Sequence, residues 1–433
     1  MVDNNLPPES AARGLTDVQL SALVVQGLFG RYTHKIPLPT TPGDDSLPSV
    51  LILYGMNGVG KTTVLRMLDG MISLNFDIFR EIPFDSCYLE FSTEDQLLVK
   101  RGKIGLNVRF RDHEVVLSSK IGTKGPQNPD HEGLVKEFRE AFFRSIENIS
   151  FNFVDTDRVK ANLADQVDQD QRVLFDSNIQ ILKGQVLQRN RQSVPRPLAT
   201  KVRMFIQEAQ LDSQRFFGSG EPDLFNRIME DLSNLQESVT SIDDMKDAFA
   251  LVDKRDSNHR RLGLRPDRWD YDRLRKLIDR SVSSSDSHSW TVLSTYADFL
   301  SSRSDARQLI AERLESFEDV MNDLLVDKTI TVDSRRGLRI MAGDSEIGEM
   351  QLSSGEYQLL FLMIAALTTR RKGTVLAIDE PELSMHPSWQ RKLVRSLVRC
   401  ASGAAPQIIL ATHSPDVSMD YSQNMVELTR TLS

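Results

Sequence analysis

Residues 50–62 read VLILYGMNGVGKT, and this stretch decides the fold. Residues 50–54 form a short apolar run, as expected of a strand buried on both faces. Residues 55–62 then match the pattern G-x-x-x-x-G-K-[ST] in full, and an amphipathic helix is expected from Thr62 to Ile72. The glycines let such a loop curl so that backbone N–H groups point at phosphate oxygens, and the helix N-terminus adds its positive end. The stretch therefore predicts a nucleotide phosphate site in an α/β domain.

The same pattern assigns roles to single residues of the loop. Lys61 is expected to reach the β- and γ-phosphates, and the Thr62 hydroxyl is expected to bind Mg²⁺. The alternative is a glycine-rich turn that only caps a helix, and the strand before it and the helix after it argue against that alternative. The candidate nucleotide-binding residues are Asn57, Gly58, Val59, Gly60, Lys61, Thr62 and Thr63.

The composition is that of an ordinary globular chain. A length of 433 residues exceeds one simple domain, and a net charge of −8 excludes a chain that is basic as a whole. Two cysteines, Cys87 and Cys400, cannot form a disulfide framework or a four-thiolate zinc site. The N-terminus lacks a secretory signal, and no apolar run reaches the roughly 20 residues that a membrane helix needs. We therefore expect a soluble, cytoplasmic protein without a membrane partner.

Strands alternate with helices on both sides of a helical stretch, which predicts a split α/β core with an inserted, mainly helical lobe. We expect a flexible tail at residues 1–18, core segments at 19–126 and 328–433, and the lobe at 127–327. Residues 149–154 (ISFNFV) have strand character and could belong to the core sheet. Further strands are expected at 22–25, 32–38, 87–91, 97–100, 105–117, 329–332, 338–341, 374–378 and 407–411, and helices at 133–147, 201–217, 223–236, 355–368 and 387–400.

Two acids follow the apolar strand in residues 374–380, which read TVLAIDE. In open α/β sheets, ligands sit at the carboxyl ends of the strands. Beside a phosphate loop, Asp379 is expected to hold Mg²⁺ directly or through water, and Glu380 to orient or deprotonate the attacking water. For such a pair standing alone, a helix N-cap would be the commoner interpretation.

A serine–glycine turn in residues 350–358, MQLSSGEYQ, precedes a strongly apolar helix. Ser353, Ser354 and Gly355 lie at the start of this helix, where N–H groups and hydroxyls can bind an anion. For the turn taken alone, an N-cap with a capping box is the commoner interpretation.

In order and spacing, these motifs carry a family resemblance. GMNGVGKT at 55–62, LSSGE at 352–356, LAIDEPELSMHP at 376–387 and ATHSP at 411–415 together resemble the ABC-type ATPases. Two features resemble the RecF/SMC/OLD-like (AAA-like ATP-binding protein) branch of this family. They are Asn57 in the phosphate loop and the DEPE-x-x-x-HP string at residues 379–387, with Trp389 and Gln390 after it. The resemblance does not cover the lobe, where SMC proteins have a long coiled coil and this sequence has helices broken by prolines.

The resemblance implies a head-to-head homodimer, or a higher homo-oligomer, with two ATP molecules at the interface. Ser354 and Gly355 of one subunit would face the γ-phosphate that Lys61 of the other subunit holds. Residues 384–386 would form the D-loop that crosses the interface, and His413 would contact the γ-phosphate as the switch histidine. A lone histidine at a strand end is otherwise more often structural.

Two further assignments follow from the resemblance alone. Relatives have a glutamine that bridges metal and water between the phosphate loop and the lobe, and Gln96 is the nearest candidate. Tyr32 could stack on adenine, as an aromatic residue does in relatives, or it could be a partly buried strand residue.

Basic residues cluster in the expected lobe. Lys183, Arg189, Arg191, Arg196, Lys201 and Arg203 occur without an intervening acid, and Lys254, Arg255, Arg260, Arg261 and Arg265 form a second cluster. Local excesses of this kind are expected where a protein contacts the phosphates of duplex DNA. The commoner explanation for a charge run is a solvated loop or helix face.

The sequence thus predicts an ATPase that uses ATP and Mg²⁺ as a switch, and two biological roles remain open. One is DNA-directed repair or processing of the RecF/SMC type. The other is a sensor or scaffold that controls a separate effector, a nuclease or a toxin, as the ATPase subunits of antiphage systems such as Septu or PARIS do. No nuclease domain of its own is expected after Asp416, and the inserted lobe disfavours a transporter motor.

Overall fold

The computed structural model describes most of the chain. The described residues are 18–39, 48–118, 129–146, 149–155, 197–218, 220–233, 242–264, 273, 276, 279, 287–369 and 373–429. They form two compact units. The first holds the described residues of Met1–Asp155, Thr369–Glu382 and Ala404–Ser433, and the second those of Thr156–Thr368 and Leu383–Gly403. The expected tail, apart from Val18, lies outside the described residues.

The first unit contains a parallel sheet that carries the phosphate loop. Its strand order is β14-β3-β13-β12-β8, and each neighbouring pair is parallel. The strands are β3 (Ser49–Tyr54), β8 (Ser150–Asp155), β12 (Thr374–Asp379), β13 (Gln407–Thr412) and β14 (Met425–Glu427). β12 and β13 are buried along their whole length, which requires cover on both faces, and helix α1 (Lys61–Ser73) packs against β8, β12 and β13. The segment expected at 149–154 is the edge strand β8 of this sheet.

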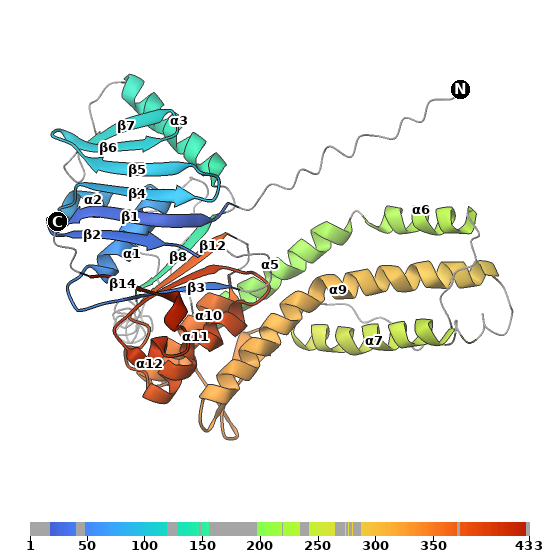
Figure 1. Cartoon of the computed structure of the whole chain (residues 1–433). Helices are drawn as coiled ribbons and strands as arrows, with labels where there is room; N and C mark the ends of the chain where they lie inside the picture. Colours follow the sequence, from blue (N-terminus) through green and yellow to red (C-terminus); the bar gives the residue numbers. More distant parts are fainter. Residues whose placement is uncertain are drawn as a thin grey trace, which may run out of the picture. The chain divides into compact units, whose positions relative to one another are not determined.

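The same unit contains a six-stranded antiparallel sheet in the order β2-β1-β4-β5-β6-β7 (Figure 1). Its strands are β1 (Leu20–Leu28), β2 (Tyr32–Pro37), β4 (Ser86–Phe91), β5 (Gln96–Arg101), β6 (Gly105–Phe110) and β7 (His113–Ser118). One face packs on helices α1, α2 (Asp77–Glu81) and α3 (Pro129–Ser145), where the rings of Phe110 and Phe142 meet edge to face at 5.1 Å. The single strand expected at 105–117 is in fact a hairpin, because Arg111 adopts a left-handed φ of 51° and turns the chain.

The first unit ends in short elements that follow β13. These are α12 (Pro415–Ser418), η3 (Ser422–Asn424) and the edge strand β14. Leu428, just after β14, donates its N–H to the carbonyl of Tyr54 at 2.8 Å, so the chain returns to the end of β3.

The second unit is built around one long helix. Its elements are α5 (Leu198–Gly218), α6 (Gly220–Ser233), α7 (Ile242–Arg261), α9 (Ser287–Leu324), β9 (Lys328–Asp333), β10 (Gly337–Ala342), β11 (Ser345–Ile347), η2 (Glu349–Gln351), α10 (Ser354–Leu367) and α11 (Pro387–Ala401). Figure 1 shows α6 and α7 lying along α9. Leu314, Phe317 and Met321, which have helical spacing, are fully buried near the end of α9.

This grouping differs from the expected domain boundary at residue 328. α10 and α11 were expected in the core, but they cluster with the lobe helices. The physical reason is the apolar surface of α10, which is buried on nearly every side and packs on both α9 and α11. In the described part of the chain, no helix is long and apolar enough to cross a membrane.

The basic clusters of the lobe are only partly described. Residues 183–196 lie outside the described residues. Lys201 lies with its ammonium 4.6 Å from the centre of the Phe361 ring, and burial lowers its pKa, which Glu349 opposes. In the second cluster, Arg255 pairs with Asp305. Lys201 and Arg255 thus contact other side chains of the fold, whereas Arg203 and Lys254 are exposed.

Candidate functional site

The phosphate loop lies between β3 and α1 and has the backbone that its glycines allow. Gly55, Gly58 and Gly60 have φ values of 153°, 82° and 97°. A Cβ on Gly60 would lie 2.8 Å from Cδ2 of Leu28, so a larger residue would clash as well as being strained. The loop is therefore restricted to glycine by its conformation and by its close neighbours.

Lys61 is drawn into the curl of this loop. Its Nζ donates hydrogen bonds to the carbonyls of Gly55 at 2.7 Å and Met56 at 3.2 Å. Burial lowers the pKa of Lys61, and the nearby carboxylates of Glu380, Asp379 and Glu382 oppose this. The ammonium is thus held where a bound phosphate could replace the two carbonyls.

Parallel register brings the acids at the end of β12 to the phosphate loop. Asp379 is 6% exposed and accepts a hydrogen bond from Thr62. Burial raises its pKa to about 6, with help from Glu380 and Asp155, while the Thr62 bond and Arg66 oppose the shift. A carboxylate in this setting favours a nearby cation, because a cation would offset both burial and the like charges.

Thr62 and Asp379 fit a magnesium site of the kind that is completed by substrate. Among the described residues, no group of three His, Cys, Asp or Glu side chains could hold a metal alone. Mg²⁺ in nucleotide enzymes is usually held by one or two protein oxygens, phosphates and waters, so a hydroxyl and one buried carboxylate suffice. Asp155 is held by Arg66 at 2.9 Å on the neighbouring strand, and the sequence analysis did not identify either residue.

Glu380 and His413 meet at the ends of two neighbouring strands. Nε2 of His413 lies 2.6 Å from Oε1 of Glu380. Glu380 has a left-handed φ of 47° and donates its N–H to the carbonyl of Ala411 at 2.8 Å. Such a conformation is costly for a residue with a side chain, and it persists because the neighbouring strand holds it. The strain aims the carboxylate at the histidine.

Glu382 is a further residue of this site that the sequence analysis did not assign. Its Oε1 accepts hydrogen bonds from the Thr412 hydroxyl at 2.6 Å, the His413 N–H at 2.9 Å and the Ser414 N–H at 3.2 Å. One carboxylate therefore fixes the turn that carries His413. The available signal was the third acid of the DEPE string, two residues after Glu380.

The LSSGE turn belongs to the second unit. Ser353 caps α10, its hydroxyl accepting from the Glu356 N–H, and Ser353 and Ser354 are exposed. Gly355 approaches the expected D-loop, since a Cβ there would lie 2.5 Å from the carbonyl of Ser384. Ser384 itself has a left-handed φ of 64°. The turn thus presents two hydroxyls at a helix start, packed on the 384–386 segment.

Gln96 lies away from the metal-binding position proposed for it, and Tyr32 agrees with the second of its two interpretations, a strand residue. Gln96 begins β5 and its amide contacts Glu90 at 3.4 Å, and none of its contacts reaches Thr62 or Asp379. Tyr32 is 7% exposed and stacks on His34 with ring centres 5.8 Å apart, so it is a buried strand residue. Gln96 therefore has no place in the metal site proposed below.

The β1–β2 hairpin still supports the phosphate loop through other residues. Nε2 of His34 lies 3.1 Å from the carbonyl of Val59, and burial lowers the pKa of His34. Phe29, at the hairpin turn, is 37% exposed, and its ring lies 3.3 Å from the position of a Cβ on Gly60. Phe29 is thus an exposed aromatic residue next to the loop, whereas adenine stacking was one of the two interpretations offered for Tyr32.

Asp379→Asn is expected to raise the melting temperature of the nucleotide-free chain at pH 8. The folded-state pKa of about 6 lies above the ordinary value of 3.8, so the charged carboxylate destabilises the fold once the pH exceeds the folded value. The increase in melting temperature over the wild type should shrink as the pH falls from about 6. It should vanish below about 4, where Asp379 of the wild type is protonated in both the folded and the unfolded state. Thermal unfolding between pH 4 and 8 checks this, with exposed Asp420→Asn as the control. A lower melting temperature at pH 8 would contradict it.

Comparison with known proteins identifies the family. A stretch of 137 residues is 26% identical to the "Retron Vc95 probable ATPase" of Vibrio cholerae serotype O1 biovar El Tor, covering 29% of this chain and 26% of that protein. The chain thus spans about a quarter of the length of this curated relative. Two solved structures also align. The Smc head domain of Pyrococcus furiosus bound to the C-terminal domain of ScpA has 11% identity, coverage of 96% of this chain and 95% of the other, and a TM-score of 0.40. An SmcHead bound to the C-winged helix domain of ScpA has 12% identity, coverage of 94% and 93%, and a TM-score of 0.38.

Residues 50–420 match a single family description, which takes in the phosphate loop, the LSSGE turn, the Asp379–Glu380 pair and His413. The match confirms the resemblance to ABC-type ATPases that the motifs indicated. The chain is an AAA-type ATPase and belongs to the family described as "AAA domain, putative AbiEii toxin, Type IV TA system".

Proposed function

We propose that the chain is an ATP-hydrolysing switch in which two copies close around two ATP molecules and open after hydrolysis. The observation that carries this is the contact of 2.6 Å between Glu380 and His413 beside the phosphate loop. A carboxylate and a histidine at the carboxyl ends of neighbouring strands are suited to activate water and to sense the γ-phosphate. Glu380 also lies near Lys61, where burial lowers the pKa of the lysine and the Glu380 carboxylate opposes this.

Each residue of the site then has a task in phosphoryl transfer. Lys61 exchanges its bonds to Gly55 and Met56 for β- and γ-phosphate oxygens. Thr62 and Asp379 would hold Mg²⁺, which when bound neutralises charge on the phosphates. Glu380 orients the attacking water and accepts its proton, and His413 donates a hydrogen bond to the γ-phosphate. Glu382 keeps His413 in place.

The closed state needs the second unit of another copy. Ser354 and Gly355 at the start of α10 offer a hydroxyl and helix N–H groups to the γ-phosphate held by Lys61 of the partner. Exposure of Ser354 supports this role, because the residue is open to a partner. The segment 384–386 packs on Gly355 and would be part of the same contact.

ATP, but not ADP, is expected to convert the chain from monomer to dimer. The γ-phosphate is the group that both Lys61 and Ser354 would contact, so the dimer depends on its presence. Light scattering after size exclusion with a non-hydrolysable ATP analogue measures this. Ser354→Arg should remain monomeric while it still binds nucleotide, because the larger side chain blocks the partner and leaves the phosphate loop intact. If both proteins dimerise equally, the proposed interface is wrong.

For the biological role, we propose antiphage defence, with the chain controlling a separate effector such as a nuclease or a toxin. The support lies in the family, whose description names an AbiEii toxin and a type IV TA system, and in the similar Vibrio cholerae protein, the probable ATPase of a retron. Contact with duplex DNA is the alternative role. The structure offers it less support, because Arg255 and Arg261 of the basic cluster are paired with acids of α9.

A further inference from the structure

In the second unit, side chains of helix α9 form hydrogen bonds to the backbone of the edge strand β9, where another strand could otherwise pair. β9 is an outer strand of the sheet β11-β10-β9, so alternate N–H groups point away from β10. Asn322 accepts from the Ile330 N–H at 2.7 Å and donates to the Ile330 carbonyl at 3.0 Å. Glu318 accepts from the Val332 N–H at 2.6 Å. A shift of α9 along its axis would therefore pull on β9 directly.

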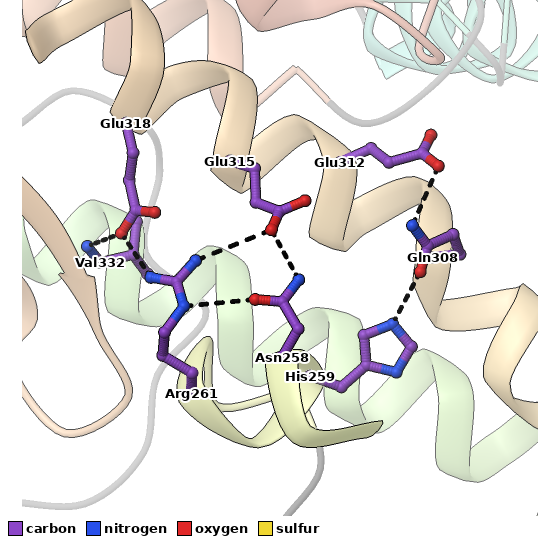
Figure 2. A network of polar contacts seen from close by, with 8 residues as sticks. All are labelled: Asn258, His259, Arg261, Gln308, Glu312, Glu315, Glu318 and Val332. Atoms are coloured by element: carbon purple, nitrogen blue, oxygen red, sulfur yellow. Dashed lines mark hydrogen bonds and ion pairs between the residues drawn. The ribbon is translucent and has the colours of Figure 1, made fainter. Parts of the chain in front are cut away.

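The end of α7 is tied to the same carboxylate. Figure 2 shows Arg261 reaching Glu318 of α9, with Nη1 at 2.9 Å from Oε1, and Glu315 at 3.9 Å. Asn258 also donates to Glu315, at 2.7 Å. Glu318 is only 9% exposed, and its hydrogen bond raises the pKa of Arg261. One buried carboxylate thus joins α7, α9 and β9.

At its other end, β9 reaches the LSSGE turn. Lys328 is the first residue of β9, and its Nζ donates to Oε1 of Glu356 at 2.7 Å. The other oxygen of Glu356 accepts from the Ser353 N–H at 2.7 Å. Burial opposes ionisation of Glu356, but the bonds from Lys328 and Ser353 hold its pKa below the ordinary value. Lys328 therefore helps to keep Glu356 charged and able to hold the turn.

α9 holds the far end of α10 as well. Arg313 is 2% exposed and donates to the carbonyl of Leu367, the last residue of α10. The side chain of Trp389 in α11 donates to the carbonyl of Leu324 at 2.9 Å, where α9 ends. The helix that begins with the LSSGE serine is thus attached to α9 at one end directly and at the other through β9.

We propose that Lys328 is a positioning residue for the LSSGE turn, and that Glu318, β9, Lys328 and Glu356 transmit the placement of α7 and α9 to Ser354. The proposal rests on the proposed function, since it assumes that Ser354 acts on ATP. Without Lys328, the buried Glu356 loses its cation and releases the Ser353 N–H, so the turn samples other conformations. A partner that moves the lobe helices would alter the same turn through Glu318.

Lys328→Met is the first test. It should increase hydrogen exchange of the backbone amides of residues 353–356 and lower kcat on the order of 10-fold, since small misplacements in an active site cost this much or more. Affinity of the phosphate loop for ATP, measured with a fluorescent analogue on the Ser354→Arg monomer background, should not change. Lys328→Arg should restore both readouts. Lys392→Met, which removes the exposed pair with Asp323 at 2.8 Å, is the matched control and should change neither.

A double-mutant cycle tests the connection to the lobe. Arg261→Met should lower kcat in the wild-type background and have little further effect on Lys328→Met, because both act through one linkage. Additive effects of the two substitutions on log kcat would overturn transmission from the lobe. If Lys328→Met does not fold, as judged by thermal unfolding, the cycle is run with Glu356→Gln, which removes the charge at the other end of the same bond.

The two proposals fail in different ways. If the wild-type chain neither hydrolyses ATP nor dimerises with it, the proposed function is wrong, while hydrogen exchange in the Lys328 variants still decides whether this lysine holds the turn. If ATP-dependent dimerisation is observed but Lys328→Met exchanges at residues 353–356 as the wild type does, the positioning role is wrong and the ATPase assignment stands.

Discussion

Glu380→Gln is expected to lower kcat for ATP hydrolysis by about 100-fold or more, while ATP binding is retained. The glutamine amide has nearly the shape of the carboxylate, but it cannot accept a proton from water. Its contact with His413, 2.6 Å in the wild type, can persist as a neutral hydrogen bond. Lys61, Thr62 and Asp379 are unchanged, so ATP and Mg²⁺ still bind, and the ATP-bound dimer should accumulate.

Single-turnover hydrolysis and light scattering after addition of ATP check this result. Glu114→Gln is the control, since Glu114 is an exposed carboxylate on β7 of the same unit. Hydrolysis at the wild-type rate by Glu380→Gln would show that another group activates the water. Loss of ATP binding would show instead that Glu380 holds the nucleotide or its metal.

Much of the parallel core could be predicted from the sequence because local pattern and local structure agree there. The apolar run at residues 50–54 is typical of a buried strand. The glycines of residues 55–60 then indicate a phosphate-binding loop. The order of the strands in the parallel sheet could not be predicted from the sequence, because neighbours such as β8 and β12 are far apart in the chain. The hairpin at Arg111 was missed for a local reason, since a left-handed arginine leaves no sequence signal comparable to glycine.

The site residues were proposed where a motif prescribes chemistry, whereas residues whose positions depend on packing could not be found in the sequence. The motifs gave Glu380 and His413 separate roles beside the γ-phosphate and did not predict their contact at 2.6 Å. The three bonds of Glu382 likewise depend on how two strand ends meet. Tyr32 and Phe29 show the same limit. Both are aromatic residues of one hairpin, and only burial reveals that Phe29 is the exposed one. The grouping of α10 with the lobe helices likewise depends on packing, because its apolar surface is buried against α9 and α11.

Glu382→Ala is expected to lower kcat by about 10- to 100-fold with a much smaller change in KM. The carboxylate accepts three hydrogen bonds from residues 412–414, and each bond to a charged acceptor contributes about 1.5–3 kcal/mol. Alanine leaves the Thr412 hydroxyl and the His413 and Ser414 N–H groups to find other partners, so the turn at the end of β13 loosens. His413 then moves relative to Glu380, while the phosphate loop that binds ATP is untouched.

Glu382→Gln separates geometry from charge in this prediction. Its carbonyl oxygen can still accept from the His413 N–H at the position where Oε1 lies 2.9 Å away, so the turn should stay in place and kcat should fall less than in the alanine variant. Steady-state kinetics of both variants, with thermal unfolding to confirm that each folds, decide the question. Equal kcat in Glu382→Ala and the wild type would mean that His413 is held by other contacts. Equal losses in both variants would mean that the negative charge beside Lys61, rather than the anchoring of the turn, is what catalysis requires.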